Sequence, residues 1–256
     1  MKRKWKNAWV IGGSTGLGAA LVRALAADDV LTYVSARNRE TLMTLSEEKP
    51  SSIIPYPLDV TDQEDCARVV SNILNTNNGL PDLIILNAAV YSPMGVDNFN
   101  AAEISNMMNV NFLGIVNMIS ALLPHKNPER SVTIAAITSP SGWRGLPGGI
   151  GYGSSKAAVI NLIESMKPEL DGSGFDVRLV NPGFIKTRLT DKNKFKMPQL
   201  MRPDDAAART LDGLSGTKFD ISFPNPFLFY LKLLRILPYS LFFWVMNKMV
   251  KNKKAR

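Results

Sequence analysis

The sequence contains very few of the residues that most often build metal centres and covalent catalytic sites. Its 256 residues include one cysteine, Cys66, and one histidine, His125. A single cysteine excludes an internal disulfide and a cysteine-based metal cluster, so we expect no metal site and a packed or half-buried Cys66. His125 follows Pro124 at the end of an expected helix, and no motif of a Ser-His-Asp triad accompanies it. Hydrolysis through such a triad is therefore not expected.

A secretion signal and the aromatic-interleaved basic motifs of nucleic-acid-binding modules are also missing. The apolar stretch after the basic start, residues 8–11, is too short for a signal peptide and runs directly into glycines. We therefore expect an unexported, cytoplasmic protein that binds no nucleic acid.

The net charge of +8 is concentrated at the two ends of the chain. Residues 2–6 contain four basic side chains, and residues 248–256 contain five. Basic ends are usually solvated, but they also suit a phosphate-bearing cofactor or an anionic membrane surface.

Length and composition indicate one α/β domain with a sizeable core, since 45% of the residues are hydrophobic. Strand-like and helix-like stretches alternate from residue 8 to residue 223, which predicts a doubly wound, mostly parallel, Rossmann-type sheet. We divide the chain into this domain, residues 1–225, and an apolar helical extension with a basic tail, residues 226–256. The expected strands are residues 8–11, 30–35, 53–58, 83–86, 131–139 and 175–180, and the expected helices are residues 19–27, 62–75, 101–123, 152–170 and 203–214.

A glycine-rich turn connects the first expected strand to the first expected helix. It reads Gly12-Gly-Ser-Thr-Gly16-Leu-Gly18. Because glycine has no Cβ, the backbone of such a turn approaches a pyrophosphate closely, and the helix N-terminus offers free N–H groups to the anion. Strand, glycine turn and helix in this order predict a dinucleotide site.

The end of the second expected strand indicates which dinucleotide is bound. A carboxylate there would bond the ribose 2′-OH of NAD(H) and repel a 2′-phosphate. This chain instead has Ser35-Ala-Arg37-Asn-Arg39, with two guanidinium groups and no acid. Arginine pairs well with phosphate, so the sequence favours NADP(H), with NAD(H) as the other candidate.

Tyr152 and Lys156 stand four residues apart on an expected helix, and therefore on one face of it. A fixed ammonium favours the phenolate and lowers the pKa of a nearby phenol from its usual value of about 10. Such a tyrosine can pass a proton to or from a substrate oxygen. Ser139 ends the preceding strand-like run, and a Gly- and Pro-rich loop leads from it to this helix, so the three side chains can converge.

Taken in order, these features resemble the short-chain dehydrogenase/reductase family over about residues 5–225. The turn matches the family's T-G-x-x-x-G-x-G, with Ile11 in place of the threonine. Ser139 lies thirteen residues before Tyr152, which is the usual separation in the family. Three further stretches resemble the family's N-A-G, V-N-x-x-G and P-G-x-x-x-T, namely Asn87-Ala88-Ala89, Val110-Asn111-Phe-Leu-Gly114 and Pro182-Gly183-Phe-Ile-Lys-Thr187.

The resemblance implies reversible hydride transfer between NADP(H) and an alcohol/carbonyl pair. Tyr152 would be the acid/base, Lys156 would lower its pKa and hold the nicotinamide ribose hydroxyls, and Ser139 would bond the substrate oxygen. Asn111 would support a proton path through a water held at a local helix distortion. Relatives are often homodimers or homotetramers through helix packing, so we expect a homo-oligomer.

The resemblance also implies the cofactor contacts. Asp59 would lie at the adenine ring, although the residues alone equally allow it to cap the helix that starts near Thr61-Asp62. The expected cofactor-binding residues are Gly12, Ser14, Thr15, Gly16, Leu17, Gly18, Arg37, Asp59, Val60, Asn87, Ala88, Tyr152, Lys156, Pro182, Gly183, Ile185 and Thr187. Residues 188–202 would form an irregular, mobile lid over the substrate.

The C-terminal stretch, residues 219–250, is strongly apolar, but Lys232, Arg235 and Pro238 interrupt it. A membrane span needs about 20 apolar residues, so we expect two short helices. They could pack on the body or on a second subunit, roof an apolar substrate pocket, or lie in a membrane interface as a peripheral contact. An apolar substrate is the expectation that follows from this ending.

A rival function is a dinucleotide-binding sensor or membrane-associated scaffold without turnover. The intact set of Ser139, Tyr152 and Lys156 argues against it, because a protein that only binds the cofactor does not need that arrangement.

Overall fold

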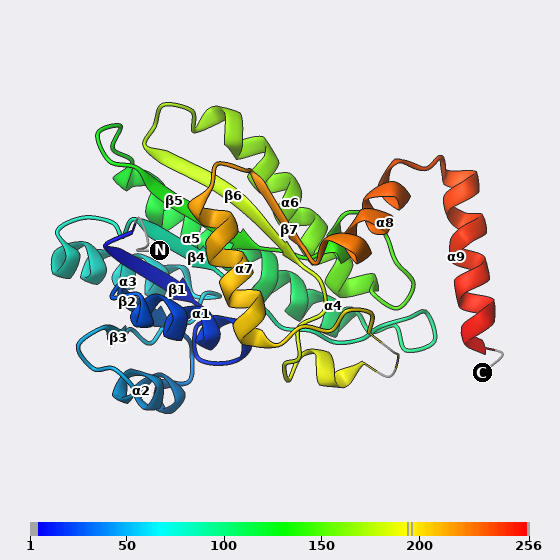
Figure 1. Cartoon of the computed structure of the whole chain (residues 1–256), viewed down its shortest axis with the longest axis horizontal. Helices are drawn as coiled ribbons and strands as arrows, with labels where there is room; N and C mark the ends of the chain where they lie inside the picture. The colour runs from blue at the N-terminus through cyan, green and yellow to red at the C-terminus, as the bar shows by residue number, and fades with distance from the viewer. Residues whose placement is uncertain (1–4, 194, 196, 255–256) are drawn as a thin grey trace.

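The computed structural model describes residues 5–193, 195 and 197–254, with the side chains of residues 251–254 left out. Of the nine basic residues near the two ends, four lie outside the described residues and three more are described without their side chains; the four are Lys2, Arg3, Lys4 and Arg256. Within the described part, parallel strands form a seven-stranded sheet in the order β3-β2-β1-β4-β5-β6-β7 (Figure 1). The strands are β1 (Asn7–Ile11), β2 (Leu31–Ser35), β3 (Ile53–Pro55), β4 (Leu83–Leu86), β5 (Val132–Ile137), β6 (Phe175–Pro182) and β7 (Asp220–Phe223).

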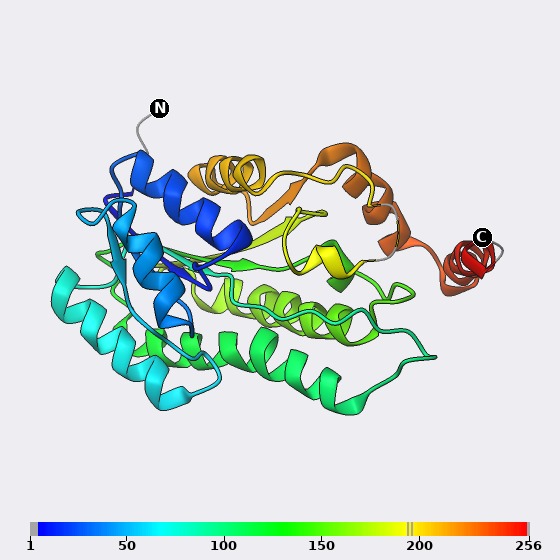
Figure 2. The ribbon, with the colours of Figure 1, turned by 90° about the horizontal axis from the view of Figure 1, so that it is seen from below.

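Helices cover both faces of this sheet, and Figure 2 shows the two layers edge-on. One buried apolar cluster joins the sheet to α1, α2 and α7, and a second joins it to α3, α5 and α6. Both faces of the central strands are therefore buried, which explains why β4 and β5 are apolar almost throughout. The helices of the body are α1 (Gly16–Ala27), α2 (Arg39–Glu47), α3 (Gln63–Asn77), α4 (Ala101–Met108), α5 (Gly114–Leu122), α6 (Ile150–Glu169) and α7 (Pro203–Ser215).

The doubly wound parallel sheet predicted from the sequence is confirmed, and the predicted strands and helices lie within a few residues of the observed ones. Two elements were missed. Helix α2 is short and mostly exposed, with Leu42 and Leu45 its only buried large apolar side chains. Strand β7 has four residues, of which Ile221 and Phe223 are buried, and so carries too little apolar pattern to stand out.

One helical stretch among the described residues, Ala101–His125, is long and apolar enough to cross a membrane by length and composition alone. It comprises α4, the π-helical turn Asn109–Leu113, α5 and a last 3-10 turn. Its buried face packs in the core beneath the sheet, with Met118 and Leu122 almost fully buried. We therefore interpret it as a core helix.

Two apolar helices follow β7, α8 (Asn225–Ile236) and α9 (Tyr239–Lys254), as the interruption at Pro238 predicted. Helix α8 lies against the body, whereas α9 projects from the end of the molecule that carries α8 (Figure 1). The proposed boundary between residues 225 and 226 falls just inside the start of α8 and remains a prediction.

Candidate active site

Ser139, Tyr152 and Lys156 meet beyond the carboxyl end of β5. Ser139 lies two residues after the end of β5. Its hydroxyl accepts hydrogen bonds from the backbone N–H of Ser141 at 3.3 Å and from the hydroxyl of Ser141 at 2.9 Å. The first turns of α6 bring Tyr152 and Lys156 to the same place, on one face of the helix. The Nζ atom of Lys156 lies 5.7 Å from the centre of the Tyr152 ring.

Lys156 is buried and donates a hydrogen bond of 2.9 Å to the carbonyl of Ile137 in β5. This bond fixes the start of α6 to the strand that carries Ser139. Burial disfavours the charged ammonium and lowers the pKa of Lys156 to about 8. The side chain therefore lies close to its titration point near neutral pH.

Burial also raises the pKa of Tyr152 to about 12, because the phenolate would lose its hydration. The Ser139 hydroxyl opposes this rise through a hydrogen bond, and Tyr91 adds to it. Desolvation is the largest effect on the pKa of both groups, and the expectation that Lys156 lowers the pKa of Tyr152 stays a prediction. Tyr152 is thus a protonated phenol at neutral pH.

Asn111 lies in the π-helical turn that separates α4 from α5. Its side chain is fully buried and makes a two-way bond with the backbone of Val90, accepting at 2.7 Å and donating at 3.0 Å, and it donates to the hydroxyl of Ser155 at 3.0 Å. The helix distortion implied by the family resemblance is therefore present. The side chain itself aligns the segment after β4 with α6, so any link to a proton path would run through other atoms of this turn.

The glycine turn after β1 is closely packed against β4. A Cβ on Gly12, where φ is +81°, would lie 2.5 Å from the backbone of Ala88. A Cβ on Gly18 would lie 2.1 Å from the carbonyl of Gly12, which in turn accepts a 2.7 Å hydrogen bond from the side chain of Asn87. Only glycine fits at these two positions, which explains the spacing of the motif.

The N-terminus of α1 opens at the same edge of the sheet. Its N-cap, Thr15, makes no side-chain capping bond, and the first turn contains no acid. Ser14 and Thr15 are accessible, whereas Leu17 is buried beneath the turn. The free N–H groups and the helix dipole suit a pyrophosphate here.

The segment after β6 approaches this turn from the other side. A Cβ on Gly16 would lie 3.0 Å from the side chain of Thr187, so the two are neighbours. Pro182 ends β6, Gly183 bonds back to the carbonyl of Phe223, and Ile185 is buried. The structure thus brings Thr187 next to the place where phosphates would bind.

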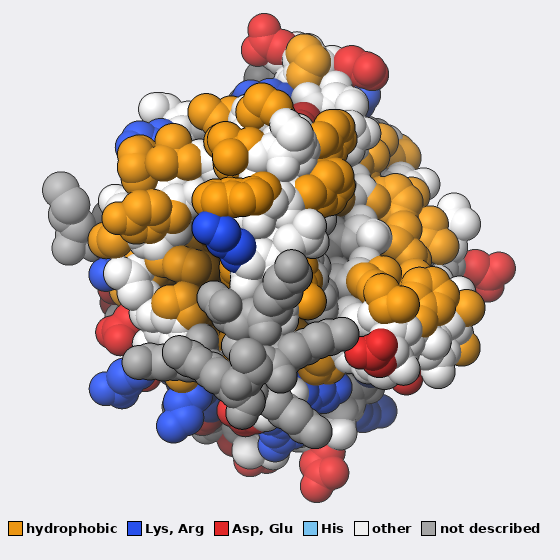
Figure 3. Space-filling model, turned by 90° about the vertical axis from the view of Figure 1, so that its right-hand side faces the viewer, with side chains coloured by type: hydrophobic (Ala, Val, Ile, Leu, Met, Phe, Trp, Pro, Cys, Tyr) orange, Lys and Arg blue, Asp and Glu red, His pale blue; other side chains and the backbone are white. Residues whose placement is uncertain are grey.

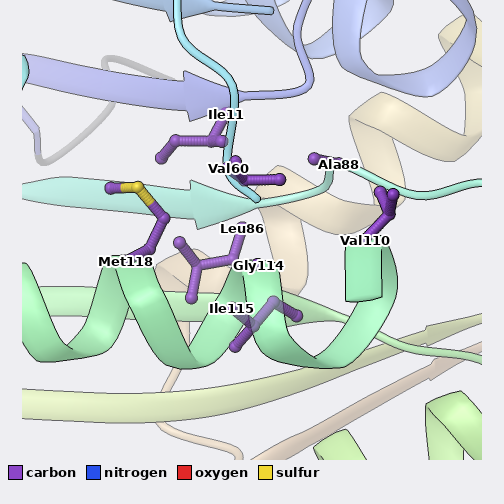
Figure 4. Close-up of a pocket in the computed structure, with 8 residues that line it drawn as sticks. All are labelled: Ile11, Val60, Leu86, Ala88, Val110, Gly114, Ile115 and Met118. Carbon is purple, nitrogen blue, oxygen red and sulfur yellow. The ribbon is translucent and has the colours of Figure 1, made fainter. Parts of the chain in front are cut away.

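Between the sheet and α5, a small apolar pocket lies beside the ends of β1 and β4 (Figure 4). Among its lining residues are Val60, Ala88 and Val110, which come from three separate family-like stretches. Asp59 is adjacent, and its carboxylate accepts bonds from the backbone N–H and the hydroxyl of Thr61. The space in this pocket is about the size of one water molecule, so it marks apolar packing at the strand ends and does not hold a base.

The alternative role of Asp59 as a helix cap is wrong. The N-cap of α3 is Asp62, whose carboxylate accepts from the backbone N–H groups of Glu64 and Asp65. Asp59 instead orders the turn before the helix.

Arg37 lies in the loop after β2 and is exposed. The loop position is fixed by Ser35, whose carbonyl accepts from the N–H groups of Gly12 and Gly13 and whose hydroxyl accepts from the Trp9 indole. Arg37 therefore starts from a backbone that is bonded directly to the glycine turn. The structure describes no ion pair of Arg37 with an acid.

Together these residues fit a nicotinamide dinucleotide. A glycine turn with an uncapped helix N-terminus and an exposed guanidinium follow the neighbouring strands β1 and β2 at the carboxyl edge of one sheet. Among the described residues no group of His, Cys, Asp and Glu could hold a metal ion. Cys66 is buried, which raises the pKa of its thiol to about 12 and makes it unreactive.

An aromatic group beside Tyr152 was missed in the sequence. Tyr91 packs edge-on against Tyr152 with ring centres 5.0 Å apart, and its hydroxyl donates to the side chain of Asn193 in the expected lid. Phe184, after β6, contacts Phe195 of the lid and Phe227 of α8, each at 5.7 Å. The aromatic residues share no motif in the sequence, because only the fold brings their four segments together.

The lid, residues 188–202, is largely irregular as expected, with one short 3-10 turn at Thr190–Lys192. Lys192 donates to the carbonyl of Tyr91, which adds a second bond between the lid and the residue that packs on Tyr152.

Comparisons with known proteins agree with this site. The family model described as short chain dehydrogenase matches residues 6–197. The chain is 30% identical to an uncharacterized oxidoreductase of Myxococcus xanthus, covering 93% of this chain and 95% of that protein. It is 28% identical to the 3-oxoacyl-[acyl-carrier-protein] reductase FabG of Thermotoga maritima, covering 75% of this chain and 79% of that one. A short chain dehydrogenase from Burkholderia cenocepacia, solved in complex with NADP, superposes with a TM-score of 0.81 at 25% identity, covering 94% and 97% of the two chains.

Proposed function

This chain belongs to the short-chain dehydrogenase family of NAD(P)-dependent oxidoreductases, and from that premise we propose that it uses NADPH to reduce an apolar ketone or aldehyde. The observation that carries the proposal is the convergence of Ser139, Tyr152 and Lys156 at the same edge of the sheet as the glycine turn. A bound nicotinamide supplies the hydride.

The protein's own part is to hold the substrate oxygen and to give it a proton. The Ser139 hydroxyl donates a hydrogen bond to the carbonyl oxygen and stabilises the charge that develops on it. Tyr152 donates its phenolic proton to the same oxygen. A phenol with a pKa of about 12 carries that proton at neutral pH and can give it to the substrate oxygen.

Lys156 supports this step by position and by charge. Its bond to Ile137 holds the start of α6 against β5, and its ammonium, when protonated, stabilises the tyrosinate that proton transfer leaves behind. Lys156 would also bind the hydroxyls of the nicotinamide ribose. Asn111 keeps the segment after β4 in register with α6, and so acts as a positioning residue.

The preference for NADPH rests on the loop after β2. Arg37 is exposed, and neither Arg37 nor Arg39 is accompanied by an acid at the strand end. The relative from Burkholderia cenocepacia was solved with NADP, which supports the same choice.

An apolar substrate follows from the walls on the substrate side. Tyr91, Phe184, Phe195 and Phe227 bring aromatic rings from four segments to this region. One relative is named as a 3-oxoacyl-[acyl-carrier-protein] reductase, a name that points to acyl carbonyls as a class to try. We further propose a homo-oligomer that works in the cytoplasm.

The test is NADPH oxidation by the purified protein against a panel of carbonyls. The panel runs from small ketones to long-chain 3-oxoacyl thioesters and steroid-like ketones. We expect turnover that rises with the apolar size of the substrate. Preference for small polar carbonyls would contradict the substrate class. Tight NADPH binding without turnover on any member would favour a sensor instead.

A further inference from the structure

The two C-terminal helices expose large apolar side chains on the surface that Figure 3 faces. Seven of these side chains are more than half exposed, and we call them the C-terminal apolar surface. They are Phe229, Tyr230 and Ile236 of α8 and Tyr239, Phe243, Trp244 and Met249 of α9. Contiguous exposed apolar surface of this kind marks an interaction site.

Packing on the body accounts for only one side of α9. Phe242 and Met246 are its buried side chains among those described. The guanidinium of Arg144 lies 4.0 Å from the centre of the Phe242 ring and 5.0 Å from that of Tyr239.

Arg144 also fixes the junction of the two helices. Its Nη1 donates to the carbonyls of Leu234, Arg235 and Leu237 at the end of α8, at distances between 2.6 and 3.0 Å. The angle between the helices is therefore held by specific contacts. The exposure of the C-terminal apolar surface is thus a property of the folded chain.

The charge around this surface has one sign. After Asp220 the sequence contains no Asp or Glu, but it contains seven Lys and Arg residues. Lys232 pairs with Asp220, and Arg235 lies 3.6 Å from Glu164. The other five follow Trp244 and begin with Lys248, whose Nζ lies 3.7 Å from the centre of the Trp244 ring. The charge that complements this end of the chain is negative.

We propose that the C-terminal apolar surface docks this protein on the interface of an anionic lipid bilayer. Aromatic rings such as Tyr239 and Trp244 suit the headgroup level, and the basic residues that follow suit acidic headgroups. A second copy of the chain fits less well. A second copy presents the same sequence, which contains no Asp or Glu after Asp220, so its C-terminal helices supply no negative charge to pair with these basic residues.

The test is co-sedimentation of the full chain with vesicles, some of phosphatidylcholine alone and some with phosphatidylglycerol added. We expect binding to the anionic vesicles to be at least tenfold stronger, to weaken with salt, and to shift Trp fluorescence to the blue, because Trp244 is the one tryptophan of the four that is mostly exposed. The double variant Phe243→Ser/Trp244→Ser should lose the binding, as should the variant with Lys248, Lys251, Lys253 and Lys254 all changed to Gln.

Met43→Ser is the matched control, because Met43 is an exposed apolar residue on α2, at the other end of the molecule (Figure 1). It should bind vesicles as the wild type does. Thermal unfolding of Met43→Ser and of the double variant should match the wild type, since Met43, Phe243 and Trp244 are exposed, and the lysine variant is measured beside them. Equal binding to both vesicle types, or full binding by the double variant, would overturn the proposal. It would also be overturned if the double variant changed a dimer into a monomer and the wild type bound no vesicles.

Discussion

Tyr152 and Lys156 are four residues apart on one helix, and burial shifts the pKa values of both side chains. Burial favours the neutral form of each, and so raises the pKa of the phenol to about 12 and lowers that of the ammonium to about 8. The spacing of four residues correctly indicated a shared helix face. It could not indicate how deeply that face is buried, which depends on β5 and on Tyr91.

The buried ammonium of Lys156 should cost stability. Its native pKa of about 8 lies below the ordinary lysine value of 10.5, so the unfolded chain holds more protons between these two pH values. Below pH 8 the full cost is present, of about 3 kcal/mol, and it disappears as the pH rises from 8 to 10.5. Lys156→Met should therefore be about 1–3 kcal/mol more stable at pH 7, with loss of the bond to Ile137 offsetting part of the gain.

Urea unfolding at pH 7 and at pH 10.5 checks this prediction. The stability advantage of Lys156→Met should be present at pH 7 and should be lost at pH 10.5. Lys167→Met is the control on the same helix, because Lys167 is half exposed and paired with Asp176. It should gain nothing at either pH. An advantage of Lys156→Met that did not change with pH would show that the ammonium is not the cause.

At the scale of elements, the site is an alignment of strand ends. The glycine turn, the segment of Asn87 and Ala88, Ser139 and the segment ending at Thr187 follow β1, β4, β5 and β6, which are neighbours in the sheet. Parallel strands with helical crossovers place all of these ends on one edge. This explains why motifs spread over most of the chain could be predicted to form one site.

The end of β2 should select the cofactor. Arg37→Asp replaces an exposed guanidinium with a carboxylate where a 2′-phosphate would lie, and should weaken NADPH binding by roughly tenfold to a hundredfold. NADH binding should be unchanged or tighter. Fluorescence titration with both cofactors measures the effect.

Arg39→Asp makes the same charge change two residues away, where Arg39 borders a surface depression with Tyr56 and Arg68. It should have a clearly smaller effect on NADPH. Equal losses in the two variants would mean that the loop acts through its net charge, and unchanged selectivity in Arg37→Asp would remove Arg37 from the site.

Some features of the site could not be predicted from the residues alone. The π-helical turn at Asn111 was implied by the family resemblance alone, because a mid-helix asparagine gives no local signal of such a turn. The contacts of Tyr91 with Tyr152 and with Asn193 join segments that are separated by 61 and 102 residues, and no periodicity encodes them. Asp59 was ambiguous in the sequence, and only the bonds of Asp62 to α3 resolved its capping role.

At the scale of the whole molecule, the fold was predictable because the central strands are apolar almost throughout and alternate with helical stretches along the chain. The C-terminal helices were also predictable as two short elements, from Pro238 and the charges around it. Their placement was not, because it depends on Arg144, a lone basic residue in the loop between Ser139 and α6. That same loop joins the C-terminal apolar surface to the catalytic edge of the sheet.

The central claim is that Tyr152 gives the proton in carbonyl reduction, and the most direct measurement compares the wild type with Tyr152→Phe. NADPH binding, followed by fluorescence, and NADPH oxidation, with the best carbonyl of the panel, are measured on the same preparations. Tyr91→Phe is the control. It also removes a phenolic hydroxyl, but from the neighbouring ring that packs against Tyr152. We predict that Tyr152→Phe binds NADPH as the wild type does and loses turnover by at least about 100-fold, while Tyr91→Phe stays within a few-fold. Full turnover by Tyr152→Phe would contradict the account.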